Sequence, residues 1–155
     1  MTNFERTRGP YSITTDPRRI DVDSVHAYLS RSYWAEDIPR EVVAKSIEGS
    51  LSFALLHAGR QIGFARVISD HATFAYLCDV YVLEEYRGQG LGKWLIAELQ
   101  SHPRLQGLRR FVLATRDAHG LYAQFGFMPP RNPASYMEIG RPDFYKRANG
   151  PSVDP

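Results

Sequence analysis

The sequence predicts a single α/β (α+β) domain, with a central mixed and mostly antiparallel sheet flanked by helices on both faces. Two observations predict this fold class. The chain has 155 residues, about the size of one ordinary domain, and it contains no internal repeat or linker that would divide it. Its apolar pattern gives hairpin-connected strands first and strand–helix crossovers afterwards, an order that produces a mixed sheet covered on both sides.

The first part of the chain predicts one strand and two helices. Residues 11–15 alternate well enough for a strand. Asp21 stands where it can cap a short helix whose apolar side chains share one stripe. Pro39 suits the first turn of a second helix, in which the apolar residues from Val42 to Ile47 share a face.

Three consecutive strands are predicted in the middle of the chain. The hydrophobic period changes at Leu51, and residues 51–57, 61–69 and 73–83 are rich in the side chains that favour strands. The third segment is the most continuously apolar, which is typical of a central strand. It leads through a glycine-containing loop into a helix that ends at His102, because Pro103 follows.

The last part predicts one more crossover and a return. Residues 109–115 form a short apolar strand, and the helix after it runs from Ala118 to Phe125. Gly126 stands where a left-handed cap would end that helix. A strand is expected to return from Phe127, and after a Pro-Pro interruption residues 135–139 are expected to form the final edge strand.

Both ends of the chain are expected to be loose. Residues 1–10 are polar and contain a Gly-Pro pair, while the end of the chain is rich in Gly, Pro and small polar residues. We therefore expect a folded domain over residues 11–145 between flexible tails at 1–10 and 146–155.

Composition excludes several classes of function. Nineteen Lys and Arg stand against seventeen Asp and Glu, a net charge of +2 that gives no reason to expect nucleic acid as a partner. Cys78 is the only cysteine, so the chain has no internal disulfide, and a zinc–thiolate cluster is not expected. No stretch approaches the roughly 20 apolar residues of a membrane span, and the chain does not begin like a signal peptide. We expect a soluble, cytoplasmic protein.

A glycine-rich loop between a strand and a helix carries the most specific chemistry. The residues from Arg87 to Lys93 read Arg-Gly-Gln-Gly-Leu-Gly-Lys. Glycines let the backbone approach a ligand closely, and the free N–H groups at the start of a helix favour phosphate. The dinucleotide pattern fails because Lys93 stands where its third glycine belongs, and the P-loop pattern fails because Trp94 follows in place of Ser or Thr.

The loop resembles the pyrophosphate loop of the GNAT superfamily of N-acetyltransferases. Arg87, Gly90 and Gly92 match its Gln/Arg-x-x-Gly-x-Gly/Ala signature. A second motif, Leu-Tyr-x-x-x-Gly-Phe over residues 121–127, resembles the family's ending at the same distance along the chain. Thr115 departs from the asparagine that many members carry there.

The resemblance implies an enzyme that transfers an acetyl group from acetyl-CoA directly to a primary amine of a small molecule or peptide. The backbone at the end of the central strand would bind the pantetheine arm, and one N–H would polarise the thioester carbonyl. The loop would hold the pyrophosphate. By position, the cofactor-binding residues are Val80, Tyr81, Val82, Arg87, Gly88, Gln89, Gly90, Leu91, Gly92 and Lys93. No metal is expected.

Two residues are candidates for proton transfer. The resemblance implies that Tyr122 protonates the departing thiolate, and a phenol is protonated at neutral pH; the alternative is a core tyrosine whose hydroxyl bonds the backbone. Asp79 interrupts an apolar strand, so it is a candidate base or water-positioning group, or else a carboxylate paired with a neighbour such as Arg66. We interpret His119 as a histidine on the surface and Cys78 as a small apolar residue packed in the strand.

The acceptor side is expected in the segment that joins the first two helices. Tyr33, Trp34 and Glu36 would suit a cationic amine through cation–π contact and charge, or the segment is a plain turn. The alternative function is a non-catalytic acyl-CoA-binding or sensing module. GNAT domains often form dimers, so the resemblance also implies a homodimer as an expected assembly.

Overall fold

A computed structural model describes residues 3–149. They contain one sheet of six strands, and the order of the strands across the sheet is their order along the chain. The strands are β1 (Glu5–Arg8), β2 (Tyr11–Thr14), β3 (Leu51–His57), β4 (Arg60–Ser69), β5 (Phe74–Val82) and β6 (Arg110–Leu113). Neighbours are antiparallel from β1 to β5, and β5 with β6 is parallel. The predicted mixed and mostly antiparallel sheet is confirmed.

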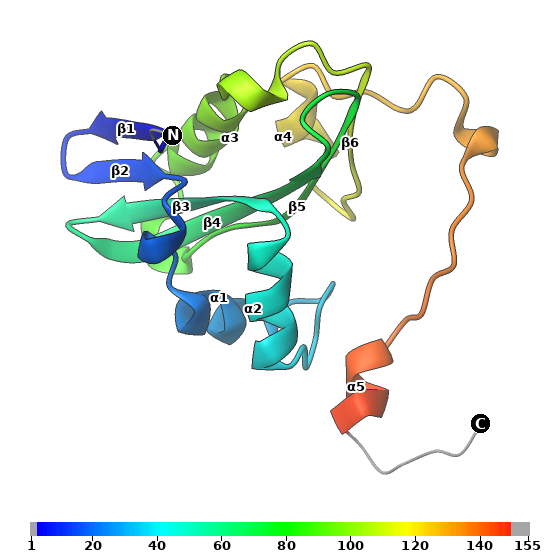
Figure 1. Ribbon diagram of the computed structural model, residues 1–155, viewed down its shortest axis with the longest axis horizontal. Helices are drawn as coiled ribbons and strands as arrows, with labels where there is room; N and C mark the ends of the chain where they lie inside the picture. Colours follow the sequence, from blue (N-terminus) through cyan, green and yellow to red (C-terminus); the bar gives the residue numbers. More distant parts are fainter. Residues whose placement is uncertain (1–2, 150–155) are drawn as a thin grey trace.

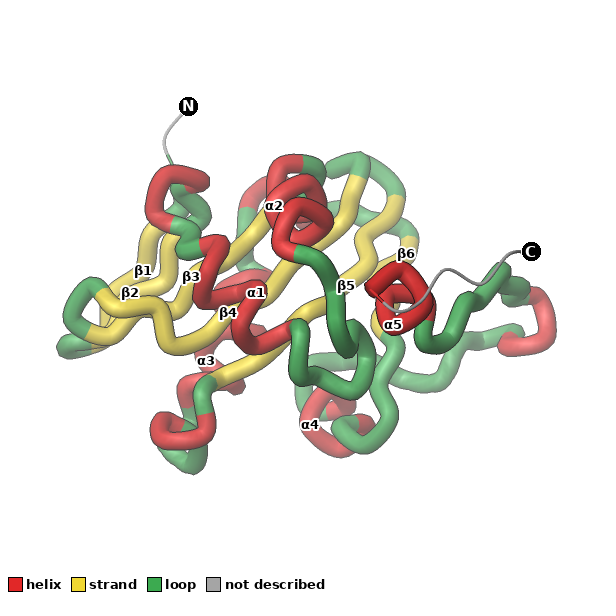
Figure 2. Tube along the Cα trace, turned by 90° about the horizontal axis from the view of Figure 1, so that it is seen from below, coloured by secondary structure: helices red, strands yellow, loops and turns green. Residues whose placement is uncertain are grey.

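Helices cover both faces of the sheet. They are α1 (Val22–Leu29), α2 (Arg40–Glu48), α3 (Leu91–Gln100), α4 (His119–Ala123) and α5 (Phe144–Asn149). Short 3₁₀ turns occupy Pro17–Arg19, Glu84–Tyr86, Pro103–Leu105 and Pro133–Ser135. Figures 1 and 2 show α1 and α2 on one face, with α3 and α4 on the other. The short β5–α3–β6 connection is the crossover that a parallel strand pair requires.

Two apolar clusters hold these layers together. On the α3 face, Phe53 and Leu55 of β3 pack with Leu95 of α3. On the α1–α2 face, Ala54 and Leu56 of the same strand pack with the second cluster. Because successive side chains of a strand point to opposite faces, β3 is buried on both sides, and each large side chain contributes about 1.5–3 kcal/mol to folding.

The local end signals of two helices are confirmed. The carboxylate of Asp21 accepts a hydrogen bond from the backbone N–H of Ser24 at 3.1 Å, which caps α1. Gly126, just after α4, has φ = 93°, a left-handed conformation that a glycine adopts without a steric penalty.

The start of the chain differs from the expected loose tail. Glu5–Arg8 pair with β2 in a hairpin whose turn is formed by Gly9 and Pro10, and Gly9 has φ = 55°. Phe4 is buried, with its ring in an edge contact to Phe53 at 6.0 Å between centroids. The strand is fully exposed and charged, so it has no alternating apolar pattern by which the sequence could reveal it.

The end of the chain also differs from expectation. Residues 135–139 form no strand, and β6 is the last strand in the part that the structure describes. Every residue from 128 to 144 is exposed, and Figure 1 shows this segment running outside the sheet and its helices to α5. The expected tail begins inside α5, and its residues 150–155 lie outside the described ones.

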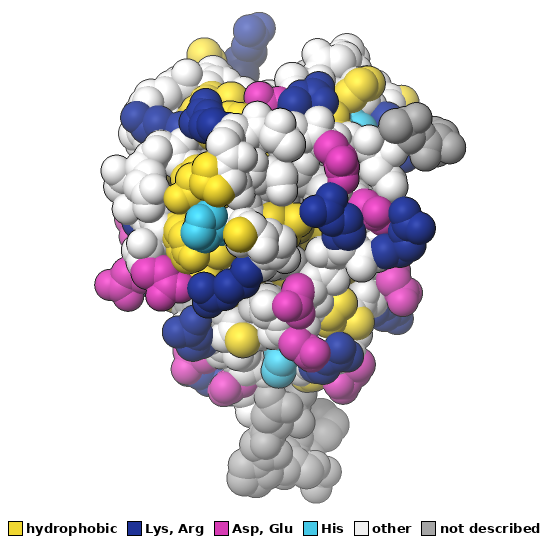
Figure 3. All heavy atoms as spheres, turned by 90° about the vertical axis from the view of Figure 1, so that its left-hand side faces the viewer, with side chains coloured by type: hydrophobic (Ala, Val, Ile, Leu, Met, Phe, Trp, Pro, Cys, Tyr) yellow, Lys and Arg dark blue, Asp and Glu magenta, His cyan; other side chains and the backbone are white. Residues whose placement is uncertain are grey.

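The surface agrees with the near balance of charges. On the face seen in Figure 3, lysines and arginines are interspersed with acidic side chains and form no block of one sign. Within residues 3–149, no helix is long and apolar enough to cross a membrane.

Candidate active site

The central strand β5 is longer than its neighbour β6, and this difference creates a free edge. The pairing of β5 with β6 ends at Leu77 and Leu113, whereas β5 continues to Val82. On the other side, β4 stays paired with β5 up to Gly63 opposite Val82. Among the described residues, the last five of β5 therefore have a strand on one side only, the arrangement in which an extended ligand can add as a further strand.

One hydrogen bond shows which side of β5 the backbone groups of each residue face. The N–H of Leu83 donates to the carbonyl of Ile62 on β4 at 2.8 Å. Backbone groups of an antiparallel strand alternate between its two sides, so those of Val82 and Val80 point to the free edge. The carbonyl of Val82 accepts a hydrogen bond from Arg87 Nε at 2.9 Å, as this direction requires.

A bulge lies at the start of the free edge. The β4–β5 register shifts between Phe64 and Arg66, opposite Asp79, whose φ is 55°. A residue other than glycine in this conformation stores roughly 1–3 kcal/mol of strain, and such residues cluster at functional sites. Bulges also redirect side chains, and here the bulge turns β5 where β6 ends.

A cavity of about 360 Å³ opens beside this bulge, between the ends of β5 and β6, the start of α4 and the α1–α2 connection. It is lined by Tyr33, Trp34, Tyr76, Leu77, Cys78, Asp79, Val80, Leu113, Ala114, Thr115, Arg116, Asp117, Ala118 and Tyr122. The structure thus brings together Tyr33, Trp34, Asp79, Val80 and Tyr122, which the sequence placed on three separate segments.

Both carboxylate oxygens of Asp79 are engaged. Arg66 Nε donates to Oδ2 at 2.8 Å, and Trp34 Nε1 donates to Oδ1 at 2.9 Å. The side chains of Arg66 and Asp79 are only 15% and 10% exposed, and Arg66 also donates to the Ser50 hydroxyl at 2.9 Å. The ion pair that the sequence left as an alternative is present. Each carboxylate oxygen can still accept another hydrogen bond.

Tyr122 carries a phenol at the cavity wall. Burial, together with the nearby Tyr33, raises the pKa of Tyr122 above its ordinary value of 10.0. Its ring meets Phe127 edge-on at 6.0 Å between centroids. The Tyr122 hydroxyl has no hydrogen-bond partner within residues 3–149, so the alternative of a hydroxyl bonded to the backbone does not hold.

Cys78 is a poor nucleophile in this setting. Burial, and to a smaller extent the charge of Asp79, raises the pKa of the Cys78 thiol to about 12. A thiol with this pKa stays protonated near neutral pH, and only a thiolate attacks efficiently. We therefore do not expect Cys78 to act as a nucleophile.

The acceptor segment divides into two parts. Tyr33 and Trp34 line the cavity, but the guanidinium of Arg116 already covers the Tyr33 ring at 3.8 Å from its centroid. Glu36 is not among the lining residues, and its carboxylate lies 3.1 Å from the ammonium of Lys146 in α5. The structure therefore brings the two aromatic residues to the cavity and leaves Glu36 outside it.

The glycine-rich loop has the backbone geometry that its sequence predicted. Gly88 and Gly90 adopt left-handed conformations, with φ of 82° and 78°. The first helical bond of α3 runs from the N–H of Trp94 to the carbonyl of Gly90 at 3.0 Å, so the earlier N–H groups stay outside the helical ladder. Arg87 braces the loop, because it also donates to the Tyr28 hydroxyl at 2.9 Å.

Comparison with known proteins assigns the family. The sequence model of the Acetyltransferase (GNAT) family matches residues 15–127, which include the free edge, the loop and Tyr122. The chain belongs to the GNAT family of acetyltransferases. Its strand order, its crossover and its two helical layers are therefore those of a GNAT domain, and the enzyme class predicted from the two motifs, an acyltransferase, is confirmed.

Individual relatives agree with the GNAT assignment. A protein of Gibberella zeae classed as an acetyltransferase is 34% identical over 141 residues, covering 76% of this chain and 78% of its own length. A crystal structure of a Xanthomonas campestris pv. campestris protein, classed as a GNAT acetyltransferase, is 52% identical with a TM-score of 0.86, covering 87% of this chain and 96% of its own.

A more distant solved structure shares the fold alone. It is an acetyltransferase of Clostridium acetobutylicum solved with acetyl-CoA, 13% identical with a TM-score of 0.61. The match covers 88% of this chain and 96% of the Clostridium acetobutylicum chain.

Sequence reasoning missed part of the cavity wall. Tyr76 lies three residues before Asp79 on β5, so the period of 2 along a regular strand would place the two side chains on opposite faces and gave no signal. Arg116 and Asp117 follow the end of β6, and only the three-dimensional structure shows that this end faces Tyr33. His119 is exposed and lies outside the lining residues. Within residues 3–149, no group of three His, Cys, Asp or Glu side chains could hold a metal ion.

Proposed function

We propose that this GNAT protein transfers an acetyl group from acetyl-CoA directly to a primary amine of a small molecule or peptide. One observation carries the proposal: the free edge of β5 at residues 80–82 runs from the glycine-rich loop to a cavity that holds the Tyr122 phenol. An extended pantetheine arm fits an edge of this kind, and the loop fits a pyrophosphate.

Different residues would bind the pyrophosphate and the thioester of acetyl-CoA. The left-handed glycines and the free N–H groups before Trp94 would hold the pyrophosphate, with Arg87 and Lys93 supplying positive charge at the two ends of the loop. The Val80 backbone, which points to the free edge and lines the cavity, would bind the thioester carbonyl and stabilise negative charge on its oxygen. Acetyl-CoA supplies the activated acetyl group.

Proton transfer would fall to Tyr122 and Asp79. The raised pKa of Tyr122 keeps its phenol protonated, so it can donate to the departing sulfur as a general acid. Asp79 is held by Arg66 and Trp34, and its remaining lone pairs would orient the acceptor ammonium or the water that removes its proton. The free hydroxyl of Tyr122 favours a catalyst over a module that only binds acyl-CoA.

A screen of amines that reports free CoA tests the proposed function. We expect CoA release only with acetyl-CoA and an amine together, and a product heavier than the amine by one acetyl group in mass analysis. Tight binding of acetyl-CoA without release of CoA with any amine would point to the non-catalytic module instead. Failure to bind acetyl-CoA by calorimetry would contradict both functions.

Gly90→Ala is expected to raise KM for acetyl-CoA about tenfold, because an L residue at this φ costs roughly 1–2 kcal/mol and reshapes the loop. Gly107→Ala is the matched control. Gly107 has a φ of 70° with open space around it and lies between α3 and β6, so it should lose similar stability without a change in KM. An equal rise in KM in both variants would show that the loop has no special role.

Trp34→Phe is expected to raise the acceptor KM by about tenfold and to leave KM for acetyl-CoA within about twofold. The substitution keeps an aromatic ring at the cavity but removes the N–H bonded to Asp79, a bond to a charged group worth roughly 1.5–3 kcal/mol. Glu36→Gln is the control from the same segment and should leave both values unchanged, because Glu36 lies outside the cavity. Steady-state kinetics with both substrates varied would decide between these outcomes.

A further inference from the structure

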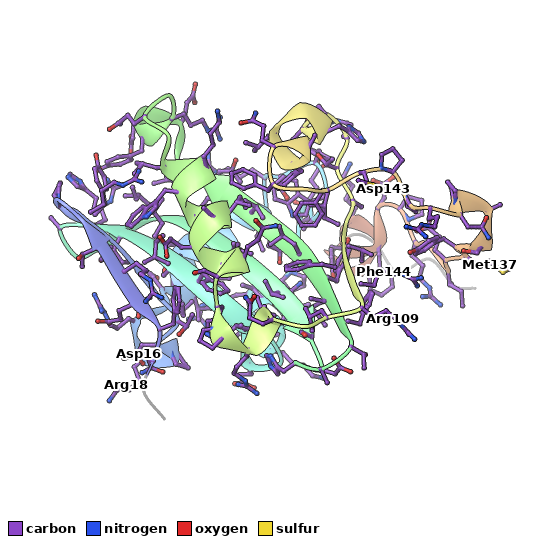
Figure 4. The ribbon with its side chains drawn as sticks, turned by 90° about the horizontal axis from the view of Figure 1, so that it is seen from above. Asp16, Arg18, Arg109, Met137, Asp143 and Phe144 are labelled. Atoms are coloured by element: carbon purple, nitrogen blue, oxygen red, sulfur yellow. The ribbon has the colours of Figure 1, made fainter. Side chains whose placement is uncertain are left out.

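A second cavity, of about 220 Å³, lies at the end of the sheet where the chain enters β1, leaves β2 and begins β3. The end of α2 and the turn after α3 complete its wall, and it shares no lining residue with the cavity beside Tyr122. Figure 4 labels Asp16 and Arg18, which flank the lining residue Pro17, and shows them at the opposite end of the molecule from Met137. The second cavity is therefore a separate place on the protein.

A buried hydroxyl without a partner lines the second cavity. Ser52, on β3, is only 6% exposed, and its hydroxyl has no hydrogen-bond partner within residues 3–149. A buried polar group that stays unpaired lowers the stability of a protein, so its presence needs an explanation. A ligand in the cavity that accepts a hydrogen bond from Ser52 would supply that explanation.

His102 offers a second donor, because its tautomer is fixed. Its Nδ1 accepts a hydrogen bond from the backbone N–H of Arg104 at 3.0 Å, which leaves the proton of the neutral ring on Nε2. Burial, followed by the charges of Arg104 and His71, lowers the pKa of His102 below its ordinary value of 6.5, so the ring is neutral near pH 7. His102 lines the cavity, and its Nε2–H has no hydrogen-bond partner in the part of the chain that the structure describes.

Arg104 adds an unpaired positive charge to the wall of the second cavity. Its guanidinium forms no ion pair or hydrogen bond with any residue from 3 to 149. No Asp or Glu is among the lining residues, and Asp16, which lies between the lining residues Thr15 and Pro17, is paired with Arg18 at 3.0 Å. The cavity therefore presents donors and positive charge, which together favour an anionic acceptor.

The rest of the wall indicates which kind of anion fits. Phe4, Ile20, Ile47 and Leu51 give the second cavity an apolar side. A carboxylate suits the donors, because its two oxygens can accept from an arginine and from a hydroxyl or an imidazole N–H at once. The apolar side chains would cover a short hydrocarbon body, for which the volume leaves room, whereas inorganic phosphate would leave them uncovered.

Ser50 connects the second cavity to the candidate active site. It lines the second cavity, and its hydroxyl accepts a hydrogen bond from Arg66 Nη1 at 2.9 Å. Nε of the same Arg66 donates to Asp79 at 2.8 Å, and Asp79 accepts a further bond from Trp34 Nε1 at 2.9 Å. A carboxylate beside Ser50 can accept from Arg66 in its place, which would change how the guanidinium holds Asp79.

We propose that the second cavity is a regulatory site that binds a small carboxylate with a short apolar body, and that its occupant acts on Asp79 through Ser50 and Arg66. The carboxylate accepts hydrogen bonds from the three unpaired donors, and the apolar side chains cover its hydrocarbon body. The site goes beyond the proposed acetyl transfer, because neither acetyl-CoA nor an amine takes part in it.

An NMR titration of the isotope-labelled full chain tests the site without any measurement of activity. Straight-chain carboxylates from propanoate to octanoate, and benzoate, are added in turn while the backbone signal of Ser52 is followed. We expect saturable shifts with at least one of them, and none with the amine or the amide of the same carbon skeleton, which lack the anionic acceptor. No saturable shift with any carboxylate, or equal binding of the matched amine, would overturn the proposal.

Two variants separate ligand binding from folding. Arg104→Met and Ser52→Ala should each raise the Kd of the best carboxylate about tenfold. Ser52→Ala should not lower stability in urea unfolding, because the hydroxyl that it removes has no partner within the described residues. Arg60→Met is the matched control: Arg60 pairs with His57 at the other end of β3, so this variant should leave Kd unchanged. An unchanged Kd in both cavity variants would refute the site.

The indole signal of Trp34 reports on the link to Asp79. The chain has two tryptophans, and Trp34→Phe identifies which of the two indole N–H signals belongs to Trp34. A saturating carboxylate should move this signal in the wild type and leave it in place in Ser50→Ala, which keeps the three donors of the site. A Trp34 signal that does not respond in the wild type, or that responds equally in Ser50→Ala, would refute the action on Asp79.

Discussion

Tyr122→Phe is expected to lower kcat by about 10²–10⁴, the usual range for loss of a positioned general acid, and to leave KM for acetyl-CoA within about twofold. The phenol lines the cavity without a hydrogen-bond partner in residues 3–149, so its removal disturbs no structural contact of the hydroxyl. Single-turnover kinetics with saturating acetyl-CoA would measure the change in the chemical step.

Tyr76→Phe is the matched control for this prediction. Tyr76 also lines the cavity, and burial likewise raises its pKa, but it lies on β5 rather than at the position of the family motif. We expect this variant to keep kcat within about threefold, far above the loss of a general acid. An equal loss of kcat in both variants would show that the cavity needs its hydroxyl groups in general and that Tyr122 has no special role.

The pH dependence follows from the same residue. A general acid acts while it is protonated, and the pKa of Tyr122 is raised above 10.0. In the wild type, kcat should therefore not decline on the alkaline side until above about pH 10, and the decline should be absent in Tyr122→Phe.

Arg66→Met is expected to destabilise the protein by about 3 kcal/mol or more, the usual result of removing one partner from a buried ion pair. It would leave the Asp79 carboxylate, only 10% exposed, with the Trp34 N–H as its remaining partner. Urea unfolding followed by circular dichroism would measure the loss. The double variant Arg66→Met with Asp79→Asn should recover part of it, because the unpaired charge is gone.

Arg60→Met is the matched control for the buried pair. Arg60 and Glu85 form an ion pair at 3.4 Å, but their side chains are 64% and 62% exposed. Surface pairs of this kind contribute about 0–1 kcal/mol, so this variant should stay close to the wild type. If Arg66→Met were equally mild, the Asp79 carboxylate would not depend on its ion pair.

The role of Asp79 illustrates how far sequence reasoning reaches. A charged residue in an apolar strand identified the position, and the two interpretations, a reactive group or a paired one, stayed open. Arg66 is 13 residues away and Trp34 is 45 residues away along the chain, so no local pattern could show that both hold the same carboxylate. The left-handed φ of Asp79 arises from the bulge between β4 and β5, which depends on how two strands pair.

The two ends of the chain show the same limit in another form. The charged strand β1 is stabilised by its pairing with β2 and by Phe4 at its start, because its own side chains are all exposed. The sequence at residues 135–139 predicted a strand, yet this segment has no strand beside it within the described chain. A strand depends on its partner, and a single sequence does not show where the partner lies.

The sequence by itself determined the class of fold, the order of the elements from β2 to α4, the conformation of the glycine-rich loop and the family, because glycine conformations, caps and hydrophobic periods act over a few residues. The tertiary structure alone decided that β5 extends beyond β6 and leaves a free edge. It also decided that Asp79 forms an ion pair with Arg66, and that Glu36 pairs with Lys146 instead of lining the cavity. Each of these depends on contacts between segments far apart in the chain, and such contacts form only when the sheet and its helices pack together.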